Sequence, residues 1–375
     1  MDSPGATVSI GYSSRRPSGL SKRRLSGIIT RVAIPRTIFP TSLRWNTDMR
    51  GWWSFLLLIV LSLSISGQVA AQSEVLYHLV TGGETTYLVE KTRSLEYLAR
   101  TLGLRPWVLS RQTKLKGNTV LKPGQVLKIY SSHMVPTEIS DGLVINLPEL
   151  LVYQFYRGVY QRRYAVAIGK KDWPTPTGTY VILNKRENPT WNVPPSIQEE
   201  MEEMGMEVVE KVPPGPKNPL GKYWIGTSAE NVGLHATNRP WSVGHSVSHG
   251  CMRMLPDEIA ELYPQVEVGS PIKIIYQPVK MALTRQGHIY LEAHPNVYDY
   301  KINYLEYVQK LAKSYQLEDR IDWPKVDTIL KIKEGVAREI TKAPEAARHA
   351  SESPRPANLR KLGLSPLQGQ DTRIE

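Results

Sequence analysis

Short apolar runs recur through the middle of the chain, and polar turn formers separate them. Each run is rich in Val, Ile, Leu or Tyr, the residues that favour strands. The runs are residues 143–147, 150–155, 164–169, 179–183 and 269–276. Short strands at this spacing are typical of a β-sandwich or barrel. The pattern therefore predicts a mainly β domain that begins near Pro136.

A different pattern precedes this domain. Residues 94–103 combine a Ser N-cap, apolar residues at helical spacing and a terminating Gly. Residues 107–111 add a second helical turn, and strand-like runs at 87–89 and 121–129 enclose both helices. The sequence predicts a small βααβ unit here.

Beyond residue 278 the pattern changes again. It predicts a hairpin and two helices, over residues 280–300, 304–315 and 326–340. The last segment, 343–375, is polar, basic and Pro-containing, which is typical of a disordered tail.

The N-terminal region predicts export. Residues 49–71 read as a signal peptide, because Arg50 precedes an apolar run and small residues stand before a cut after Ala71. The run is shorter than the ~20 residues that a spanning helix needs, although an uncleaved anchor stays an alternative. We interpret residues 1–48 as a non-native upstream extension with translation starting at Met49; a long targeting extension is the competing interpretation.

The excess of basic over acidic residues does not indicate a nucleic-acid partner. The formal net charge is +12, but residues 1–48 hold eight Lys or Arg against two Asp. Half of the excess therefore lies outside the exported chain, and no nucleic-acid binding is expected. The sequence has no G-x-G-x-x-G or Walker motif, so no cofactor is expected either.

The candidate chemistry lies in the segment 248–253, Ser-His-Gly-Cys-Met-Arg, with His235 sixteen residues before Cys251. Cys251 is the only cysteine in the chain, and an exported protein gives a lone thiol no disulfide partner. An adjacent imidazole can stabilise a thiolate as an ion pair. Gly250 permits a sharp bend that brings backbone N–H groups toward an oxyanion. The pattern indicates acyl transfer.

Two other interpretations of the cysteine stay open at this point. A single Cys is commonly a small buried hydrophobe. A metal site is the second alternative, because His235, His245, His249 and Cys251 supply nitrogen and sulfur ligands. Since His249 and Cys251 are only two residues apart, a poor fit to zinc spacings, we expect no metal.

The segments 233–238 and 248–254 resemble the active-site signature of the L,D-transpeptidases, the YkuD-domain family. Residues 174–180 and 218–221 extend the resemblance, which spans about 137–278. It implies a β-sandwich catalytic domain with Cys251 as nucleophile and His235 as its base, oriented by the carbonyl of Ala236. The residues expected to bind substrate or the oxyanion are Ser248, His249, Gly250 and Arg253.

The resemblance also implies a function in the periplasm. A Cys251 thioester forms with a peptidoglycan tetrapeptide stem, D-alanine leaves, and an amine then resolves the thioester. The acceptor is a lysine of an outer-membrane lipoprotein, slightly favoured, or another stem peptide. The alternatives are a cysteine hydrolase of wall-linked amides and a non-catalytic peptidoglycan-binding wall protein. We expect a monomer.

Two further segments complete the organisation. The βααβ unit resembles a LysM domain, which implies glycan binding, while a structural or docking role stays open. An insertion between Asn188 and Asn218 carries an acidic helix, 197–206, interpreted as a solvated face with a gating or substrate-contact role. The predicted divisions are 1–48, 49–71, 86–131 (LysM-like), 137–278 (catalytic), 279–342 (hairpin and helical extension) and 343–375.

Overall fold

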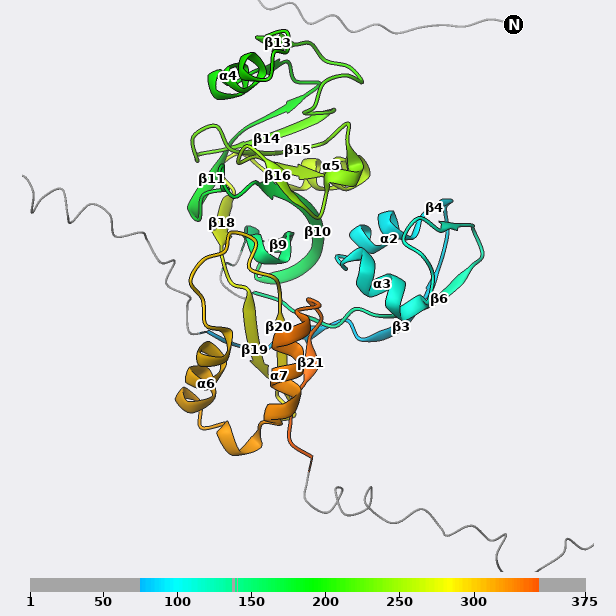
Figure 1. The fold of residues 1–375 in the computed structure, drawn as a ribbon, viewed down its shortest axis with the longest axis vertical. Helices are drawn as coiled ribbons and strands as arrows, with labels where there is room; N and C mark the ends of the chain where they lie inside the picture. Colours follow the sequence, from blue (N-terminus) through cyan, green and yellow to red (C-terminus); the bar gives the residue numbers. More distant parts are fainter. Residues whose placement is uncertain (1–74, 137–138, 140, 344–375) are drawn as a thin grey trace, which may run out of the picture. The chain divides into compact units, whose positions relative to one another are not determined.

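The computed structural model describes residues 75–136, 139 and 141–343 (Figure 1). The predicted upstream extension and signal peptide lie outside these residues, as does nearly all of the predicted tail. The proposed domain limits stay predictions. Within the described residues, no helix is long and apolar enough to cross a membrane.

A closed ring of strands forms the centre of the fold. Strand β9 pairs with β10 as well as with β8, so the largest sheet returns to its own start. The ring order is β10 (Val159–Gly169), β17 (Met252–Met254), β15 (Gly233–His235), β14 (Tyr223–Thr227), β11 (Gly178–Glu187), β18 (Pro271–Ile275), β8 (Gly142–Asn146) and β9 (Leu151–Tyr156), with β16 (Ser246–Ser248) beside the end of β10.

Two long strands divide the ring into two facing layers. The first part of β10 pairs with β9, whereas Val166 and Ala167 pair with β17. In the same way β11 pairs first with β18 and then, from Ile182, with β14. Figure 1 shows the strong curvature of β10. Because both strands pass from one layer to the other, the domain is the predicted β-sandwich closed at its corners.

The apolar positions of the two layers meet inside the ring. Leu143, Ile145 and Val152 come from one layer, and Leu234 and Met252 from the other; all five are fully buried. Burying an aliphatic side chain of this size stabilises the fold by ~2 kcal/mol. The alternating sequence pattern thus places β15 and β17, the strands that carry His235 and lead away from Cys251, on a rigid core.

The unit before the ring contains the expected βααβ arrangement. Strand β3 (Glu84–Leu88) pairs antiparallel with β6 (Val126–Tyr130), and helices α2 (Leu95–Thr101) and α3 (Pro106–Thr113) lie between them in sequence. Ser94 caps α2, since its hydroxyl accepts a hydrogen bond from the Tyr97 N–H at 3.1 Å. Strand β4 (Arg93–Ser94) pairs with β5 (Val120–Leu121) in this unit, and β2 (Val80–Thr81) pairs with β7 (His133–Met134). Strand β1 (Leu76–Tyr77) instead pairs with β19 (Val279–Leu283), after the ring.

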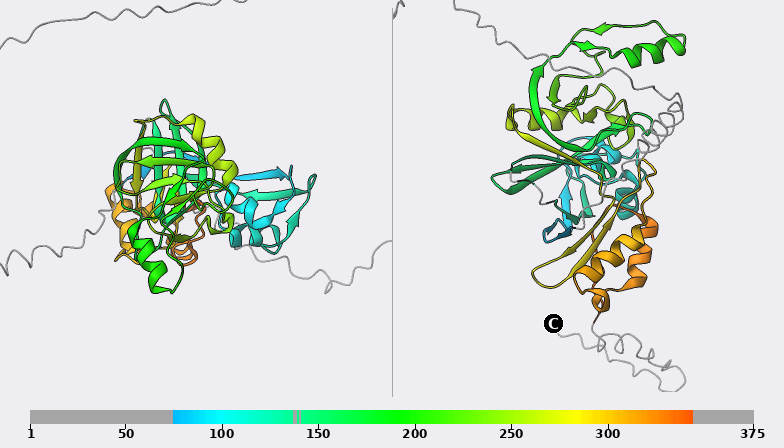
Figure 2. Two further views of the ribbon diagram at one scale, coloured as in Figure 1. Left: turned by 90° about the horizontal axis from the view of Figure 1, so that it is seen from above. Right: turned by 90° about the vertical axis from the view of Figure 1, so that its left-hand side faces the viewer.

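The segment after the ring, drawn in yellow and orange in Figure 2, forms a second, small layer to which β1 adds a strand parallel to β19. The hairpin of β19 (Val279–Leu283) and β20 (Ile289–Ala293) packs against α6 (Tyr304–Ser314) and α7 (Trp323–Ile332). The expectation of a helix continuing to Ile340 is wrong. Lys333 and Gly335 take positive φ angles of 52° and 75°, so the helix ends and β21 (Arg338–Glu339) joins β20.

A buried ionic cluster fixes this hairpin. The Lys280 ammonium lies 2.8 Å from a Glu149 oxygen and 2.9 Å from a Glu292 oxygen, and all three side chains are fully buried. The same ammonium donates to the Met134 carbonyl at 2.8 Å. Burial opposes ionisation of Glu292, but Lys280 and then His294 hold its pKa below the usual value. The carboxylates are therefore matched by an internal cation.

Candidate active site

Cys251 lies in the tight connection between β16 and β17. Gly250, just before it, has φ of +103°, a conformation that residues with a Cβ rarely adopt. The Gly250 carbonyl accepts a hydrogen bond from the Thr175 hydroxyl at 2.8 Å, and the Cys251 carbonyl accepts one from the Ser248 hydroxyl. These contacts fix the backbone on each side of the thiol.

His235 ends β15, and the parallel register places it opposite Arg253 of β17. The His235 Nδ1 lies 2.5 Å from the carbonyl oxygen of Ala236. Because a carbonyl only accepts, Nδ1 carries the proton, and Nε2 of the neutral ring holds the lone pair that a base requires. Trp224 stacks on the imidazole with ring centroids 6.0 Å apart. The orientation by Ala236 that the resemblance implied is present.

The electrostatics favour a neutral pair in the free protein. Burial lowers the pKa of His235 to about 4, and the Arg253 charge acts in the same direction. Burial also raises the pKa of the Cys251 thiol, although the Gly233 N–H and Arg253 offset part of this effect. The thiol Sγ lies 3.3 Å from the Asn231 carbonyl oxygen. The expected thiolate–imidazolium ion pair is therefore not the resting state at neutral pH.

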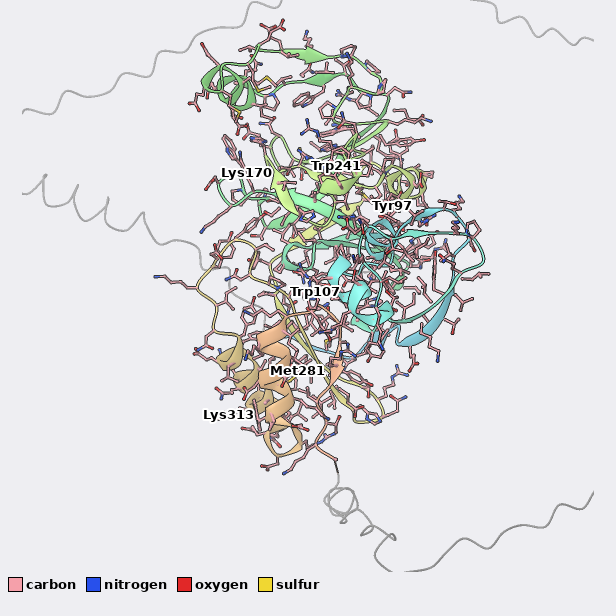
Figure 3. All side chains as sticks on the ribbon, turned by 45° about the vertical axis from the view of Figure 1, so that its right-hand side comes forward. Tyr97, Trp107, Lys170, Trp241, Met281 and Lys313 are labelled. Atoms are coloured by element: carbon pink, nitrogen blue, oxygen red, sulfur yellow. The ribbon has the colours of Figure 1, made fainter. Side chains whose placement is uncertain are left out.

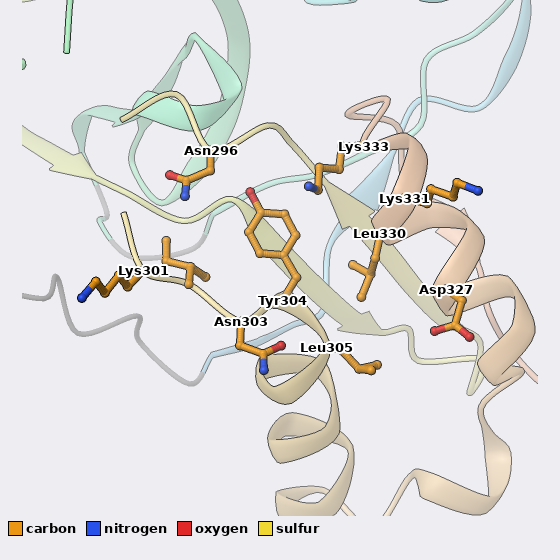
Figure 4. Close-up of a pocket in the computed structure, with 10 residues that line it drawn as sticks. Asn296, Lys301, Asn303, Tyr304, Leu305, Asp327, Leu330, Lys331 and Lys333 are labelled. Atoms are coloured by element: carbon orange, nitrogen blue, oxygen red, sulfur yellow. The ribbon is translucent and has the colours of Figure 1, made fainter. Parts of the chain in front are cut away.

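All six residues selected from the sequence line one cleft of about 810 Å³. These are His235, Ser248, His249, Gly250, Cys251 and Arg253. Two other hollows have similar volumes, about 760 and 730 Å³, and neither has Cys or His in its lining. Figure 4 shows the first of these, which lies between α6 and α7. Its Lys333 ammonium sits 4.7 Å from the centre of the Tyr304 ring. The Cys251 thiol and the His235 imidazole thus share the cleft of the ring domain.

The cleft also gathers cations that the sequence did not single out. Arg239 and Lys217 line it together with Arg253. Among the described residues, no carboxylate lies within ion-pair distance of either guanidinium. Burial, followed by the nearby charge of Arg239, lowers the pKa of Arg253. Two neighbouring guanidinium groups without an acidic partner have the charge and the N–H donors that can bind a carboxylate.

The insertion supplies another wall of the cleft. Ile197 and Met201 of α4 (Pro195–Glu203) line it. Glu200 of this helix lies 2.6 Å from His249 Nε2 and 2.9 Å from Lys170 Nζ; Figure 3 labels Lys170. The interpretation of the acidic run as a solvated face is therefore wrong for Glu200. Charge periodicity alone gave no signal for this contact, because the partners are 30 and 49 residues away.

Among the described residues, one group of side chains has its ligand atoms close enough together to hold a metal ion, and this group lies outside the cleft. It consists of Glu149, Glu292 and His294, whose ligand atoms are within 4.8 Å of one another. Lys280 stands between its two carboxylates. His288 bonds Glu339 at 2.7 Å on the exposed hairpin. Both histidines beyond the ring, His288 and His294, thus have structural partners.

Comparison with known proteins now adds to the geometry. The family model of the YkuD L,D-transpeptidase catalytic domain matches residues 140–274. Residues 140–274 are an L,D-transpeptidase catalytic domain. All six cleft residues selected from the sequence fall inside it. Curated relatives of the chain are named L,D-transpeptidases, which are enzymes.

Two of these relatives come from Escherichia coli K12. The probable L,D-transpeptidase YcfS is 34% identical over 47% of this chain and 56% of its own length. The probable L,D-transpeptidase YbiS is 28% identical over 63% of this chain and 80% of its own length. The chain therefore spans little more than half of the first relative. Among solved structures, the catalytic domain of the Enterococcus faecium L,D-transpeptidase covers 37% of this chain and 99% of its own, at 22% identity and a TM-score of 0.29.

Proposed function

We propose that this protein is a periplasmic peptidoglycan L,D-transpeptidase with Cys251 as nucleophile and His235 as base. The observation that carries the proposal is that the single thiol and an oriented neutral imidazole line one cleft. The family of the domain supports the reaction class. The substrates are the stem peptides on which L,D-transpeptidases act.

The reaction begins with transfer of the thiol proton to His235 Nε2 as Sγ attacks the carbonyl of the donor's third residue. The oxygen becomes an oxyanion, which backbone N–H groups near Gly250 and Cys251 stabilise, a contribution of ~3–4 kcal/mol per donor in comparable sites. His235 returns the proton to the departing amine of D-alanine. A Cys251 thioester of the tripeptide remains.

The second half reverses these roles. An acceptor amine attacks the thioester carbonyl, His235 takes the amine proton, and the C–S bond breaks to regenerate the thiol. One imidazole serves both halves because it takes up a proton as each nucleophile attacks and gives it to each leaving group. Arg253, with Arg239 beside it, binds a carboxylate of the donor during both steps.

The proposal extends to the amine that resolves the Cys251 thioester, the acceptor. We favour the side-chain amine of a lysine at the end of an outer-membrane lipoprotein, with another stem peptide as the alternative. The βααβ unit, as a LysM-like domain, holds the enzyme on the glycan. Water as acceptor makes the protein a hydrolase.

The test is mass spectrometry of purified disaccharide-tetrapeptide incubated with the protein lacking residues 1–71. The Cys251→Ala variant is the matched control. We expect loss of D-alanine, a thioester adduct on Cys251 and amine-linked products, all absent from the variant. A lysine-terminated peptide added in competition with the stem peptide identifies the preferred acceptor. D-alanine loss that persists in Cys251→Ala contradicts the proposed nucleophile.

No reaction with any acceptor favours a non-catalytic wall-binding protein. In that case a pull-down with purified peptidoglycan distinguishes binding from inactivity of the preparation. A catalytic protein that gives only free tripeptide with every amine offered is a hydrolase.

A further inference from the structure

The insertion between Asn188 and Asn218, called the arm below, is fixed at its base. Strands β12 (Trp191–Asn192) and β13 (Lys211–Val212) pair antiparallel, and α4 lies at the far end of this pair. Asn218, which is 1% exposed, closes the base by donating its amide N–H groups to the Pro189 carbonyl at 2.8 Å and the Val212 carbonyl at 3.2 Å. The base is therefore held to the domain independently of α4.

Packing contributes little to holding the helix itself. None of the side chains of α4 is buried. Its apolar Ile197 and Met201 are half-buried and line the cleft. Since hydrophobic stabilisation grows with the apolar area removed from water, this helix needs polar contacts to stay against the ring.

Those polar contacts converge on Glu200. Its two carboxylate oxygens reach His249 Nε2 at 2.6 Å and Lys170 Nζ at 2.9 Å. In the described part of the chain, these are the side-chain hydrogen bonds that join α4 to residues outside the insertion. The hydrogen bond from Lys170, followed by that from His249, holds the pKa of Glu200 below its usual value.

Both partners belong to the neighbourhood of the nucleophile. His249 is two residues before Cys251, and its ring lies 5.4 Å from that of Trp173. The Lys170 N–H donates to the Ser248 carbonyl at 2.8 Å. One carboxylate from the arm thus contacts both segments that frame the thiol.

We propose that Glu200 is a positioning residue that latches α4 over the cleft and fixes the side chain of His249 beside Cys251. With the latch closed, Ile197 and Met201 cover the cleft and keep water from the thioester. Opening it admits the donor peptide. The kinetic consequences rest on the proposed transpeptidase function, whereas the latch itself does not.

Hydrogen–deuterium exchange measures the latch without substrate. The samples are the full chain, Glu200→Ala, Glu200→Gln and the control Glu203→Ala, an exposed carboxylate on the same helix. We expect residues 195–203 to exchange at least tenfold faster in Glu200→Ala. Glu203→Ala should match the unmodified protein, and Glu200→Gln should lie between. Equal exchange in Glu200→Ala and the unmodified protein overturns the proposal, as does an equal effect of both alanine variants.

Kinetics separates positioning from a general loss of structure. In Glu200→Ala we expect the donor KM to rise about tenfold and the ratio of hydrolysis to transfer to increase, with kcat within about threefold. Lys170→Ala should show the same direction with a smaller change. A lower kcat with an unchanged KM and product ratio contradicts the latch. Inactivity of the unmodified protein counts against the proposed function, and exchange then decides the latch.

Discussion

His235 and Arg253 lie opposite each other on the neighbouring parallel strands β15 and β17. The register sets this pair, because Leu234 opposes Met252 one position earlier. Burial disfavours the imidazolium, and the guanidinium of Arg253 acts in the same direction, so the pKa of His235 falls to about 4. The His235 imidazole is therefore neutral at neutral pH, with a free lone pair on Nε2.

This relationship predicts the pH dependence of thiol reactivity. The burial that lowers the His235 pKa also raises that of Cys251, so no ion pair activates the thiol in the free protein. Alkylation of Cys251 by iodoacetamide should rise steadily above pH 8. A plateau that begins below pH 6 contradicts a neutral pair. Because the chain has a single cysteine, mass spectrometry reads the reaction directly, with Cys251→Ala as the blank.

Arg253→Gln should change both the pH profile and donor binding. Without the guanidinium the His235 pKa rises, so the acid limb of kcat/KM moves to higher pH. The lost carboxylate contact should raise the donor KM by roughly 10- to 100-fold, from the ~1.5–3 kcal/mol typical of a charged hydrogen bond. Steady-state kinetics from pH 4 to 8 measures both effects. The exposed Arg186→Gln on β11 is the control and should change neither.

Gly250→Ala should lower turnover without preventing folding. A Cβ at Gly250 meets no atom closer than 3.9 Å, so the cost is the φ of +103° rather than a clash. A strained residue of this kind costs about 1–3 kcal/mol. Relief of that strain moves the Cys251 N–H, and kcat should fall at least tenfold.

Gly158→Ala is the matched control for that change. Gly158 has φ of +74° with no atom within 4 Å of its Cβ position, in the turn between β9 and β10. The thermal stability of Gly158→Ala should fall by about as much as that of Gly250→Ala, while its kcat should stay unchanged. Equal kcat losses in the two variants rule out a specific role for the nucleophile turn.

Glu258 of α5 (Pro256–Leu262) should make stability fall as the pH rises. Burial raises the pKa of its carboxyl to about 8, against a smaller opposing effect of Arg162 at 3.9 Å. The unfolded chain releases this proton near pH 4.5, so between pH 4.5 and 8 the folded state binds more protons and loses stability with rising pH. Glu258→Gln should raise Tm at pH 8 by several degrees, equivalent to ~2 kcal/mol, and should have a small effect at pH 4.5.

Calorimetry at both pH values measures this difference. The exposed Glu267→Gln should show no such pH-dependent gain. A Glu258→Gln variant with the same Tm increment at both pH values contradicts the raised pKa.

Lys280→Met should destabilise the protein strongly. The change removes the cation between Glu149 and Glu292, which are both fully buried. Loss of one partner from a buried ionic cluster costs about 3–5 kcal/mol. Urea unfolding measures the change, with the exposed Lys313→Met on α6 as control. A loss below about 1 kcal/mol contradicts the proposed role of the cluster.

Much of this protein follows from its sequence by local rules. The alternating runs that became the ring strands, the Ser94 cap and the residues around Cys251 all depend on neighbours close in the chain. The same holds for Gly250, whose turn requires a residue without a Cβ. A helix expected to reach Ile340 failed because residues 333 and 335 take positive φ, and the periodic pattern carries no sign of that choice for a lysine.

Tertiary structure decided what depends on distant partners. The neutral resting state of Cys251 and His235 comes from burial and from the register that brings Arg253 alongside. Glu200 stood in a run of like charges that predicted a solvated face, yet folding places His249 and Lys170 within its reach. Sequence pattern fixes which side chains are available, but burial and through-space charge set their pKa values and pairings, and both exist only after the strands have closed the ring.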